Sequence, residues 1–233
     1  MGLREMKKQQ TRENISHEAT RLFLRHGFDR VTIADVAAAA QVAKMTVTNY
    51  FPRKEDLALD LHEAFVQRLA RTVADRAPGE SALTALRRGF LHAAERRDPV
   101  IGFSGAGFAR MITDSPALVA RLREFHEERE DALAAVLAED TGAAPDDPLP
   151  RLAAAQLAGV HRVLFNETLR RTLNGETDDE IAAAVTATAR LAFDLLQPSL
   201  GDYAQRGVFA QGGDPLEPPS RAGRSSRHSA GPP

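Results

Sequence analysis

The chain has 233 residues, of which 43% are apolar and 27% charged, and its lack of cysteine excludes disulfide frameworks, thiolate metal sites and cysteine nucleophiles. It has neither an apolar run of about 18 residues to span a membrane nor the apolar core of a secretory signal, so we expect a cytoplasmic protein. The net charge is −2, yet residues 1–54 hold 10 Lys and Arg against 5 Asp and Glu. Such an asymmetry is expected when only one domain of a protein binds the phosphates of a nucleic acid.

Helical periodicity runs through almost every segment up to residue 196, and strand-like alternation is nearly absent, so we expect an all-α protein. Near the N-terminus, Gly27 ends one helix, Thr32 and Asp35 form a capping box for the next, and Pro52 marks a further break. The helices predicted in this part cover about residues 9–26, the segment from Thr32 to a turn at 41–43, residues 44–50 and residues 53–76.

Capping serines, prolines and glycines also mark the helices in the rest of the chain. These are expected at about residues 81–98, in a broken form around the glycine-rich residues 102–107, and at 116–139, 149–173 and 178–196. After Pro198 the composition turns to Gly, Pro, Ser and Arg, which predicts a mostly disordered tail. The chain therefore divides into a first domain of residues 1–52, a helical domain of residues 53–197 and a tail of residues 198–233.

Residues 32–54, TIADVAAAAQVAKMTVTNYFPRK, have the layout of a DNA reader. Two short helices joined by a tight turn allow the first to brace the second, which carries polar side chains into a groove. Val42, Val47 and Phe51 should anchor the second helix, because a helix this short is not stable alone. Its other face offers groups that bind base edges and phosphates. The predicted DNA-binding residues are Thr32, Lys44, Met45, Thr46, Thr48, Asn49, Tyr50 and Lys54. The alternative is that Tyr50 is a core anchor and the lysines are solvated surface.

A set of residues between 11 and 57 carries a family pattern: Ala19, Leu22-Phe23, Gly27-Phe28, Val31-Thr32, Val42, Thr46-Val47, Tyr50-Phe51, Lys54-Glu55 and Leu57. In order and spacing these residues resemble the N-terminal domain of the TetR family of one-component transcriptional regulators. The chain departs from the family pattern at Gln41, where Gly is usual, at Ala43, where Ser or Thr caps the helix, and at Thr48, where many members have an aromatic residue. A non-Gly residue at positive φ and a lost cap each cost about 1 kcal/mol.

The resemblance implies an N-terminal three-helix helix-turn-helix DNA-binding domain and a larger helical domain for ligand binding and dimerisation. It also implies a homodimer, most often a repressor, that binds a palindromic operator in double-stranded DNA and is released by a small-molecule effector of unknown identity. By analogy the middle helices enclose the effector, although plain core packing is the alternative for each aromatic residue there. The candidate lining residues are Phe65, Phe90, Phe103, Phe108, Met111, Phe125 and Phe165.

The last two predicted helices carry stripes at heptad-like spacing, which favour a four-helix bundle formed by two chains. The alternative is that these stripes belong to the core of a single chain. The residues of the predicted dimer seam are Leu152, Gln156, Val160, Val163, Ile181, Val185, Thr188, Ala192 and Leu195.

Catalysis is not indicated, because the histidines are scattered over different predicted helices and no metal-binding spacing or nucleophile elbow occurs. We therefore expect neither an enzyme nor a bound metal or cofactor. A second function stays open, that of an effector-independent DNA-binding protein of the nucleoid type. A fully packed body would favour this second function, whereas a cavity on the order of several hundred Å³ with a few polar groups would favour ligand sensing.

Overall fold

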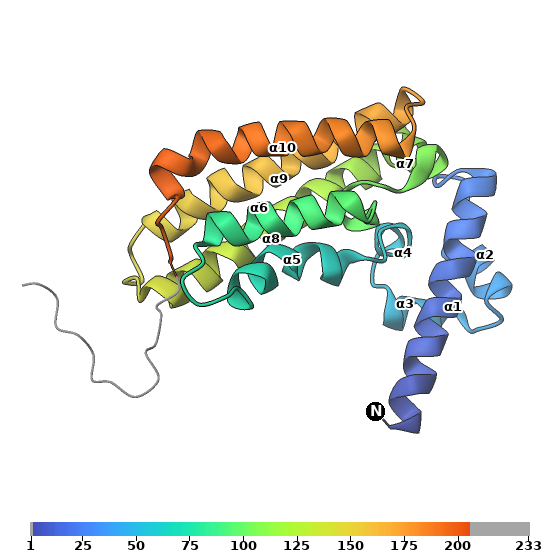
Figure 1. Cartoon of the computed structure of the whole chain (residues 1–233). Helices are drawn as coiled ribbons and strands as arrows, with labels where there is room; N and C mark the ends of the chain where they lie inside the picture. Colours follow the sequence, from blue (N-terminus) through green and yellow to red (C-terminus); the bar gives the residue numbers. More distant parts are fainter. Residues whose placement is uncertain (1, 206–233) are drawn as a thin grey trace, which may run out of the picture.

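The computed structural model describes residues 2–205, and this part of the chain consists of helices and turns without a strand (Figure 1). Short helices follow the long N-terminal helix to form a head, and the remaining helices pack lengthwise into a larger body, which confirms the all-α class. No helix within residues 2–205 is long and apolar enough to cross a membrane. The elements are α1 (Leu3–His26), α2 (Ile33–Ala39), α3 (Lys44–Tyr50), α4 (Lys54–Ala58), α5 (His62–Ala74), α6 (Ala82–Glu95), the 3₁₀ turn η1 (Pro99–Ile101), α7 (Gly105–Asp114), α8 (Pro116–Thr141), α9 (Leu149–Leu173) and α10 (Asp178–Leu200).

The first three helices and the residue that follows them share a buried apolar cluster, which continues through α4 into α5, α7, α8 and α9 of the body. The predicted capping box at the start of α2 is confirmed, since the Thr32 Oγ1 accepts a hydrogen bond from the Asp35 N at 3.2 Å and the Asp35 carboxylate accepts one from the Thr32 N at 2.8 Å. The predicted bounds of α3 are also confirmed. The head core includes Ile15, Ala19, Phe23, Val36, Val47 and Phe51.

The head and body meet at a break in what leucine spacing predicted as one helix over residues 53–76, so that prediction is wrong. The chain leaves the helix at residues 59–61, between α4 and α5. There the Asp60 carbonyl oxygen accepts a hydrogen bond from Arg12 Nη2 at 3.1 Å, and the Asp60 carboxylate accepts one from the Ser16 hydroxyl. Because both donors belong to α1, the break arises from a tertiary contact that leucine spacing does not report.

In the body, α5 packs against α8, α8 against α9, and α10 against both α6 and α9. Buried aliphatic and aromatic side chains from these helices form a continuous core. The predicted bounds of α9 are confirmed. Ser81 caps α6 as expected, with its Oγ accepting a hydrogen bond from Thr84 N at 3.3 Å, but α6 ends at Glu95 instead of near Asp98. Asp98 begins η1 instead, because its carboxylate accepts a hydrogen bond from Val100 N at 2.9 Å.

The glycine-rich segment of residues 102–107 is broken as predicted, with η1 before it and α7 beginning inside it. Gly102 has a φ of 109°, and a Cβ there would lie 2.9 Å from Thr168 Cβ and 3.2 Å from the Phe165 carbonyl oxygen. Both facts require glycine at this position. The connection between η1 and α7 therefore lies directly on α9.

The predicted helix end at residue 196 and the predicted tail from residue 198 need correction. The last helix continues to Leu200, which is buried. The carbonyl oxygen of Ala204 accepts a hydrogen bond from Arg76 Nη2 at 2.8 Å. Burial and this hydrogen bond keep residues 198–205 on the body. The rest of the predicted tail, residues 206–233, lies outside the described range.

Candidate DNA-reading surface and effector cavity

The short helix α3 carries most of the side chains predicted to read DNA. Val47 is fully buried and fixes α3 to the head, so the remaining surface of the helix is free of the core. The predicted residues lie around that surface, with Lys44, Met45 and Asn49 exposed and Thr46, Thr48 and Tyr50 half-buried. One helix therefore presents groups that bind base edges together with groups that bind phosphates.

Both departures from the family pattern before α3 are visible in the backbone. Gln41 has a φ of 56°, which places it in the left-handed region that favours glycine. Ala43 occupies the N-cap position of α3 and forms no side-chain capping hydrogen bond. Each departure costs about 1 kcal/mol, and the turn is nonetheless kept, because the buried anchors of α3 outweigh the cost.

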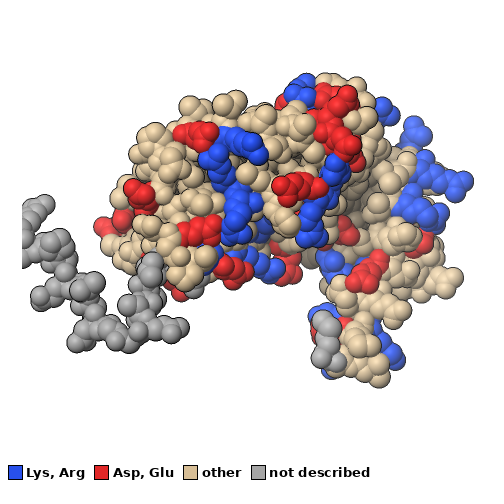
Figure 2. Space-filling model, viewed as in Figure 1, with Lys and Arg blue, Asp and Glu red and all other residues tan. Residues whose placement is uncertain are grey.

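Basic side chains also gather on the head. In Figure 2, Lys and Arg cover the edge of the molecule beside α2 and the C-terminal half of α1. On the body, by contrast, the same view shows acidic and basic side chains intermixed. This distribution agrees with the charge asymmetry of the sequence and places the excess of positive charge on the domain that carries α3.

Thr32 is exposed, but its hydroxyl group is already engaged. Thr32 Oγ1 donates a hydrogen bond to Asp35 Oδ2 at 2.7 Å and accepts one from Asp35 N at 3.2 Å. Hydrogen bonds from the Thr32 backbone and side chain lower the pKa of Asp35, which keeps this carboxylate charged. The hydroxyl proton of Thr32 is thus used by Asp35, so the predicted phosphate contact of Thr32 stays a prediction for the free amides at the start of α2.

Lys54 is half-buried, and its side chain contacts the head. Its Nζ donates a hydrogen bond to the Phe28 carbonyl oxygen at 2.6 Å and lies 4.2 Å from the centroid of the Phe28 ring. Burial lowers the pKa of Lys54, while the carboxylates of Asp29 and Glu55 act in the opposite direction. In this structure the ammonium group of Lys54 ties the start of α4 to the loop after α1, and this internal role is the alternative to its predicted phosphate contact.

Alanine substitutions of Lys44 and Lys54 should therefore change DNA binding in different ways. Lys44→Ala removes an exposed cation from the helix predicted to read DNA, so the slope of log K against log salt should become shallower by about 0.9. Lys54→Ala should leave that slope unchanged and lower the melting temperature, because it breaks an internal contact. Fluorescence anisotropy of a labelled duplex at several salt concentrations measures the slope. A shallower slope for Lys54→Ala would contradict its internal role.

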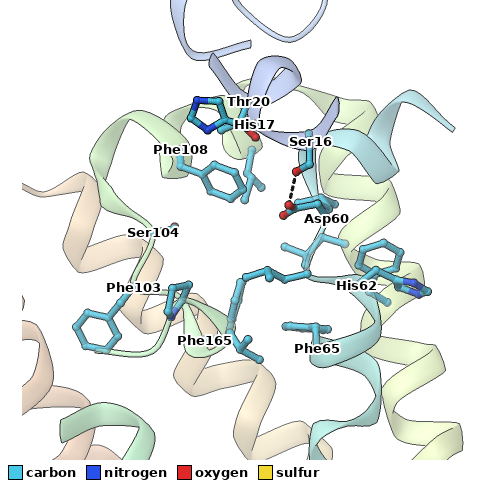
Figure 3. A pocket seen from close by; sticks show the side chains of 18 of the residues that line it. Ser16, His17, Thr20, Asp60, His62, Phe65, Phe103, Ser104, Phe108 and Phe165 are labelled. Carbon is cyan, nitrogen blue, oxygen red and sulfur yellow. Dashed lines mark hydrogen bonds between the residues drawn. The ribbon is translucent and has the colours of Figure 1, made fainter. Parts of the chain in front are cut away.

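A cavity of about 680 Å³ lies where the head meets the body (Figure 3). Its walls come from α1, the break between α4 and α5, the connection from η1 to α7, and the helices α8 and α9. Aromatic rings make up much of the wall, which suits an apolar ligand. Five of the predicted lining residues surround the cavity: Phe65, Phe103, Phe108, Phe125 and Phe165.

The other two predicted lining residues, Phe90 and Met111, lie elsewhere and are corrected. Phe90 is buried in the body core, where its ring centroid is 5.6 Å from that of His161. Met111 lines a separate groove between α1 and α7. Helical spacing indicates that a residue lies on an apolar face, but it does not indicate whether that face borders a cavity or packed core.

The polar wall of the cavity was not predicted from the sequence. Arg12, Ser16 and Thr20 of α1 line the cavity together with Asp60, and Figure 3 shows Ser16 and Asp60 at the opposite end from Phe65. A signal for this wall was present in the sequence, because Ser16 is a polar residue on the buried face of α1. The head therefore contributes directly to the cavity.

The helix α4 is fastened to both the head and the body. On the head side it is held by the contact of Lys54 with the Phe28 carbonyl oxygen. On the body side, Arg121 Nε donates a hydrogen bond to Asp56 Oδ1 at 2.9 Å. His62, the first residue of α5, lies with its Nε2 2.7 Å from an oxygen of the Glu128 carboxylate. A movement of α4 relative to α8 therefore also moves the head.

Behind the cavity, α8 and α9 bury His126, Arg129 and His161. Burial lowers the pKa of His126 to about 3, and the charges of Arg129 and Arg162 add to this effect. Burial also lowers the pKa of Arg129 to about 9 and that of His161 well below its ordinary value. At pH 7 the cluster therefore consists of two neutral imidazoles and one charged guanidinium.

Acid should destabilise the fold through His126. The unfolded chain protonates this imidazole near pH 6.5, whereas the folded protein keeps it neutral down to about pH 3. Its contribution to stability is thus complete above pH 6.5 and is lost as the pH falls towards 3, by about 1.4 kcal/mol per pH unit. In urea unfolding, the free energy of unfolding of the native protein should fall by roughly 2 kcal/mol relative to that of His126→Gln when the pH is lowered from 6.5 to 5. As a control, the loss of unfolding free energy caused by Leu133→Ala, a core change that does not titrate, should be the same at both pH values, so that the difference between the native protein and Leu133→Ala does not change with pH. A difference for His126→Gln that also did not change with pH would contradict the prediction.

One face of the last two helices exposes large apolar side chains. Leu195 is 81% exposed, Leu191 68%, Val163 60% and Leu152 55%. Such an exposed apolar stripe is typical of an interaction surface. The other predicted seam residues on the surface of these helices are the exposed Gln156 and the half-buried Val160, Thr188 and Ala192.

Two residues of the predicted seam, Ile181 and Val185, are instead fully buried within one chain. They belong to the stripe of α10 that packs against α6 and α9 in the body core. Their assignment to the seam is therefore wrong. The helix α10 has one apolar stripe in the body core and another on the surface, and their similar periodicity does not distinguish them in the sequence.

Comparisons with known proteins bear on both the head and the body. Residues 15–61 match the family model of bacterial regulatory proteins of the tetR family, and residues 80–194 match that of the MftR C-terminal domain. The HTH-type transcriptional regulator TcmR of Streptomyces glaucescens is 32% identical over 214 residues, which cover 89% of this chain and 92% of TcmR. The chain belongs to the TetR family. It is therefore a DNA-binding transcriptional regulator of the ligand-responsive kind typical of this family.

Two further similarities concern a second regulator and the fold. The mycofactocin biosynthesis transcriptional regulator MftR of Mycobacterium tuberculosis is 26% identical over 193 residues, which cover 82% of this TetR-family chain and 91% of MftR. The solved complex of SmeT with triclosan has a TM-score of 0.52 at 20% identity and covers 90% of this chain and 100% of that chain. SmeT is the repressor of a multidrug efflux pump of Stenotrophomonas maltophilia. At this identity the match confirms the shared fold.

Proposed function

We propose that this TetR-family regulator is a homodimeric repressor that binds a palindromic operator and is released when a small molecule fills the cavity between head and body. The observation that carries the proposal is the cavity of about 680 Å³ with α1 in its wall, since a ligand there touches the DNA-reading domain directly. This volume lies within the range of about 300–1,000 Å³ that is typical of small-molecule sites. The cytoplasm, where operator DNA is accessible, is the proposed location.

We propose that residues 1–52 bind DNA, whereas the body from residue 53 onwards binds the effector and forms the dimer. On α3, Asn49 suits an adenine edge, and Thr46 and Thr48 suit a base edge or a thymine methyl group. Lys44 suits guanine or a phosphate, Tyr50 suits the DNA backbone, and Met45 fills space beside them. In this scheme the half-buried threonines give sequence preference, while the lysine gives salt-dependent affinity.

The proposed release mechanism is a shift between two conformations of the head. A ligand that binds one conformation more tightly raises its population by the ratio of the two affinities. Here the ligand would fill the space between Phe65 and the pair formed by Ser16 and Asp60. Asp60 would then move with the break between α4 and α5, and α1 would move with it. The two recognition helices of a dimer would no longer match half-sites one helical turn apart.

The proposed dimer is a four-helix bundle formed by α9 and α10 of two chains. The exposed stripe supports it, because the stripe places unpaired leucines and valine along both helices. The residues proposed to meet the partner are Leu152, Gln156, Val160, Val163, Thr188, Leu191, Ala192 and Leu195. Ile181 and Val185 have no place in this interface, since they are buried within one chain.

An effector-independent nucleoid-type protein is the competing function, and the cavity weighs against it. Such a protein has no need for a cavity of this size at the junction of its domains. The cavity also contains a polar pair, Ser16 and Asp60, opposite an aromatic wall, and this combination is typical of a site that orients a ligand.

Selection of bound duplexes from a random DNA pool tests the proposal that a dimer reads a palindrome. We expect an inverted repeat whose half-site centres lie about 10 base pairs apart. Recovery of no common sequence, or of a single half-site without its repeat, would contradict the proposal. The same operator then allows compounds to be screened for release of the protein from DNA.

A further inference from the structure

The guanidinium of Arg129 is buried in the body without a carboxylate to balance its charge. The residue is 4% exposed, and no ion pair joins it to an acidic side chain of the described residues 2–205. Its Nη2 donates a hydrogen bond to His126 Nδ1 at 2.9 Å, and its Nε has no acceptor. A buried charge without a counter-ion is costly, so its presence indicates that another group balances it at some stage of the protein's function.

The surrounding charged groups do not provide the missing anion. Besides burial itself, Arg162 of α9 and Arg68 of α5 lower the pKa of Arg129, and Glu130 acts in the opposite direction without forming an ion pair with it. The charge of Arg68 is itself paired, because Arg68 Nη1 donates a hydrogen bond to the Asp98 carboxylate at 2.7 Å. The interior between α5, α8 and α9 is therefore electropositive.

The neighbouring histidines add hydrogen-bonding groups that also lack a partner. Since a guanidinium only donates, His126 Nδ1 must accept the hydrogen bond from Arg129, and the proton of the neutral ring then resides on Nε2. That Nε2 is buried without an acceptor, and so is the Nε of Arg129. His161 Nε2 is a third buried nitrogen without a partner. At least two buried N–H donors therefore lack a hydrogen-bond acceptor.

This cluster lies one aromatic layer behind the cavity wall. The guanidinium carbon of Arg129 is 4.5 Å from the centroid of the Phe65 ring. The ring centroid of His126 is 5.1 Å from that of Phe65 and 5.6 Å from that of Phe165. Both phenylalanines line the cavity, and Figure 3 shows them at the end away from Ser16. A rotation of either ring would connect the cavity with the donors of Arg129 and His126.

We propose that the effector has an apolar, aromatic-rich body and one anionic oxygen group, which passes Phe65 and Phe165 and is held by Arg129 and His126. This inference rests on the proposed function and names the ligand class of the same cavity. A carboxylate-like group accepts two hydrogen bonds from such donors, and burial of Arg129 and His126 strengthens the charge pairing. The phenylalanines contact the body of the ligand. Because Phe65 is in the first turns of α5, close to the break at Asp60, its displacement also acts on the contact between α1 and the body.

Two dyes with the same aromatic body separate charge recognition from apolar binding. Anilinonaphthalene sulfonate carries an anionic group, and phenylnaphthylamine is its uncharged counterpart. In fluorescence titrations of the full-length protein, we expect the sulfonate to bind at least about tenfold more tightly. Arg129→Met should remove this preference, and Arg129→Lys should keep part of it. The matched control Arg123→Met, which removes an exposed cation from the same helix, should leave the preference unchanged.

The melting temperature distinguishes a ligand-binding role of Arg129 from a structural one. Because methionine fills the site without an unbalanced charge, Arg129→Met should melt at the same temperature as the native protein or higher. A lower melting temperature with loss of both dyes would mark Arg129 as a structural residue and overturn the proposal. Equal affinity of the native protein for both dyes would also overturn it, while leaving the cavity and the proposed function intact. If the native protein bound neither dye, both the anion site and the proposed effector cavity would be refuted.

Discussion

Replacing Leu191 and Leu195 with glutamate should convert the protein into monomers that no longer bind operator tightly. Both leucines stand out from α10 into solvent, and α9 adds the exposed Leu152 and Val163. In the proposed dimer these side chains are buried, so two glutamates per chain would place unpaired charges inside the interface. A monomer engages a single half-site, and the loss of the second, linked contact should reduce operator affinity by about 100-fold or more.

Sedimentation velocity measures the oligomeric state of this double variant, and a gel shift with the selected operator measures its affinity. Leu24→Glu is a suitable control, because Leu24 is an exposed leucine of α1 and has no part in the proposed interface. The control should sediment as a dimer. If the double variant also sedimented as a dimer, the proposed interface on α9 and α10 would be refuted.

Phe51→Ala should abolish DNA binding while leaving the body folded. Phe51 is buried directly after α3, and its ring centroid lies 4.8 Å from the guanidinium carbon of Arg12. Truncation of a buried phenylalanine costs about 3–5 kcal/mol, which is a large share of the roughly 5–15 kcal/mol that stabilises a typical domain. Because α3 has 7 residues, it cannot remain helical once one of its two buried anchors, Val47 and Phe51, is lost.

Hydrogen exchange followed by mass spectrometry separates the two parts of the molecule in this variant. Amides of residues 33–58 should exchange rapidly, whereas those of residues 116–200 should stay protected. Phe51→Leu keeps most of the buried volume and should retain most of the operator affinity. Loss of protection over the whole chain, or normal operator binding by Phe51→Ala, would contradict the view that Phe51 anchors α3 locally.

Local signals in the sequence predicted much of the fold correctly. The capping box of Thr32 and Asp35 marks the start of α2, and the breaks on either side of α3 give its bounds. Such signals act over three or four residues, so they are readable without knowledge of the tertiary structure. The buried face of α3 could also be predicted, because Val47 is the buried residue within the helix and leaves little choice of orientation.

The features that the sequence did not predict depend on contacts between distant segments. The break before α5 is stabilised by hydrogen bonds from α1 to Asp60, and the role of Lys54 depends on the carbonyl oxygen of Phe28. Residues more than 25 positions apart meet in both cases, and helical spacing contains no information about such meetings. The same limit explains why Val185 and Leu195 were both predicted to lie in the dimer seam. They belong to two apolar stripes of α10 that have similar periodicity. Only the packing of α10 against α6 and α9 decides which stripe is covered.

Because α1 belongs to the cavity wall and shares a buried core with the helix proposed to read DNA, the two proposed ligands of this protein share one structural element. Thermodynamic reciprocity then applies: if the small molecule weakens operator binding by some factor, the operator weakens binding of the small molecule by the same factor. Molecules of the regulator already seated on DNA would thus be the least responsive, and free dimers would capture the compound first. The abundance of the protein, as well as its affinities, would set the concentration at which the regulated genes respond.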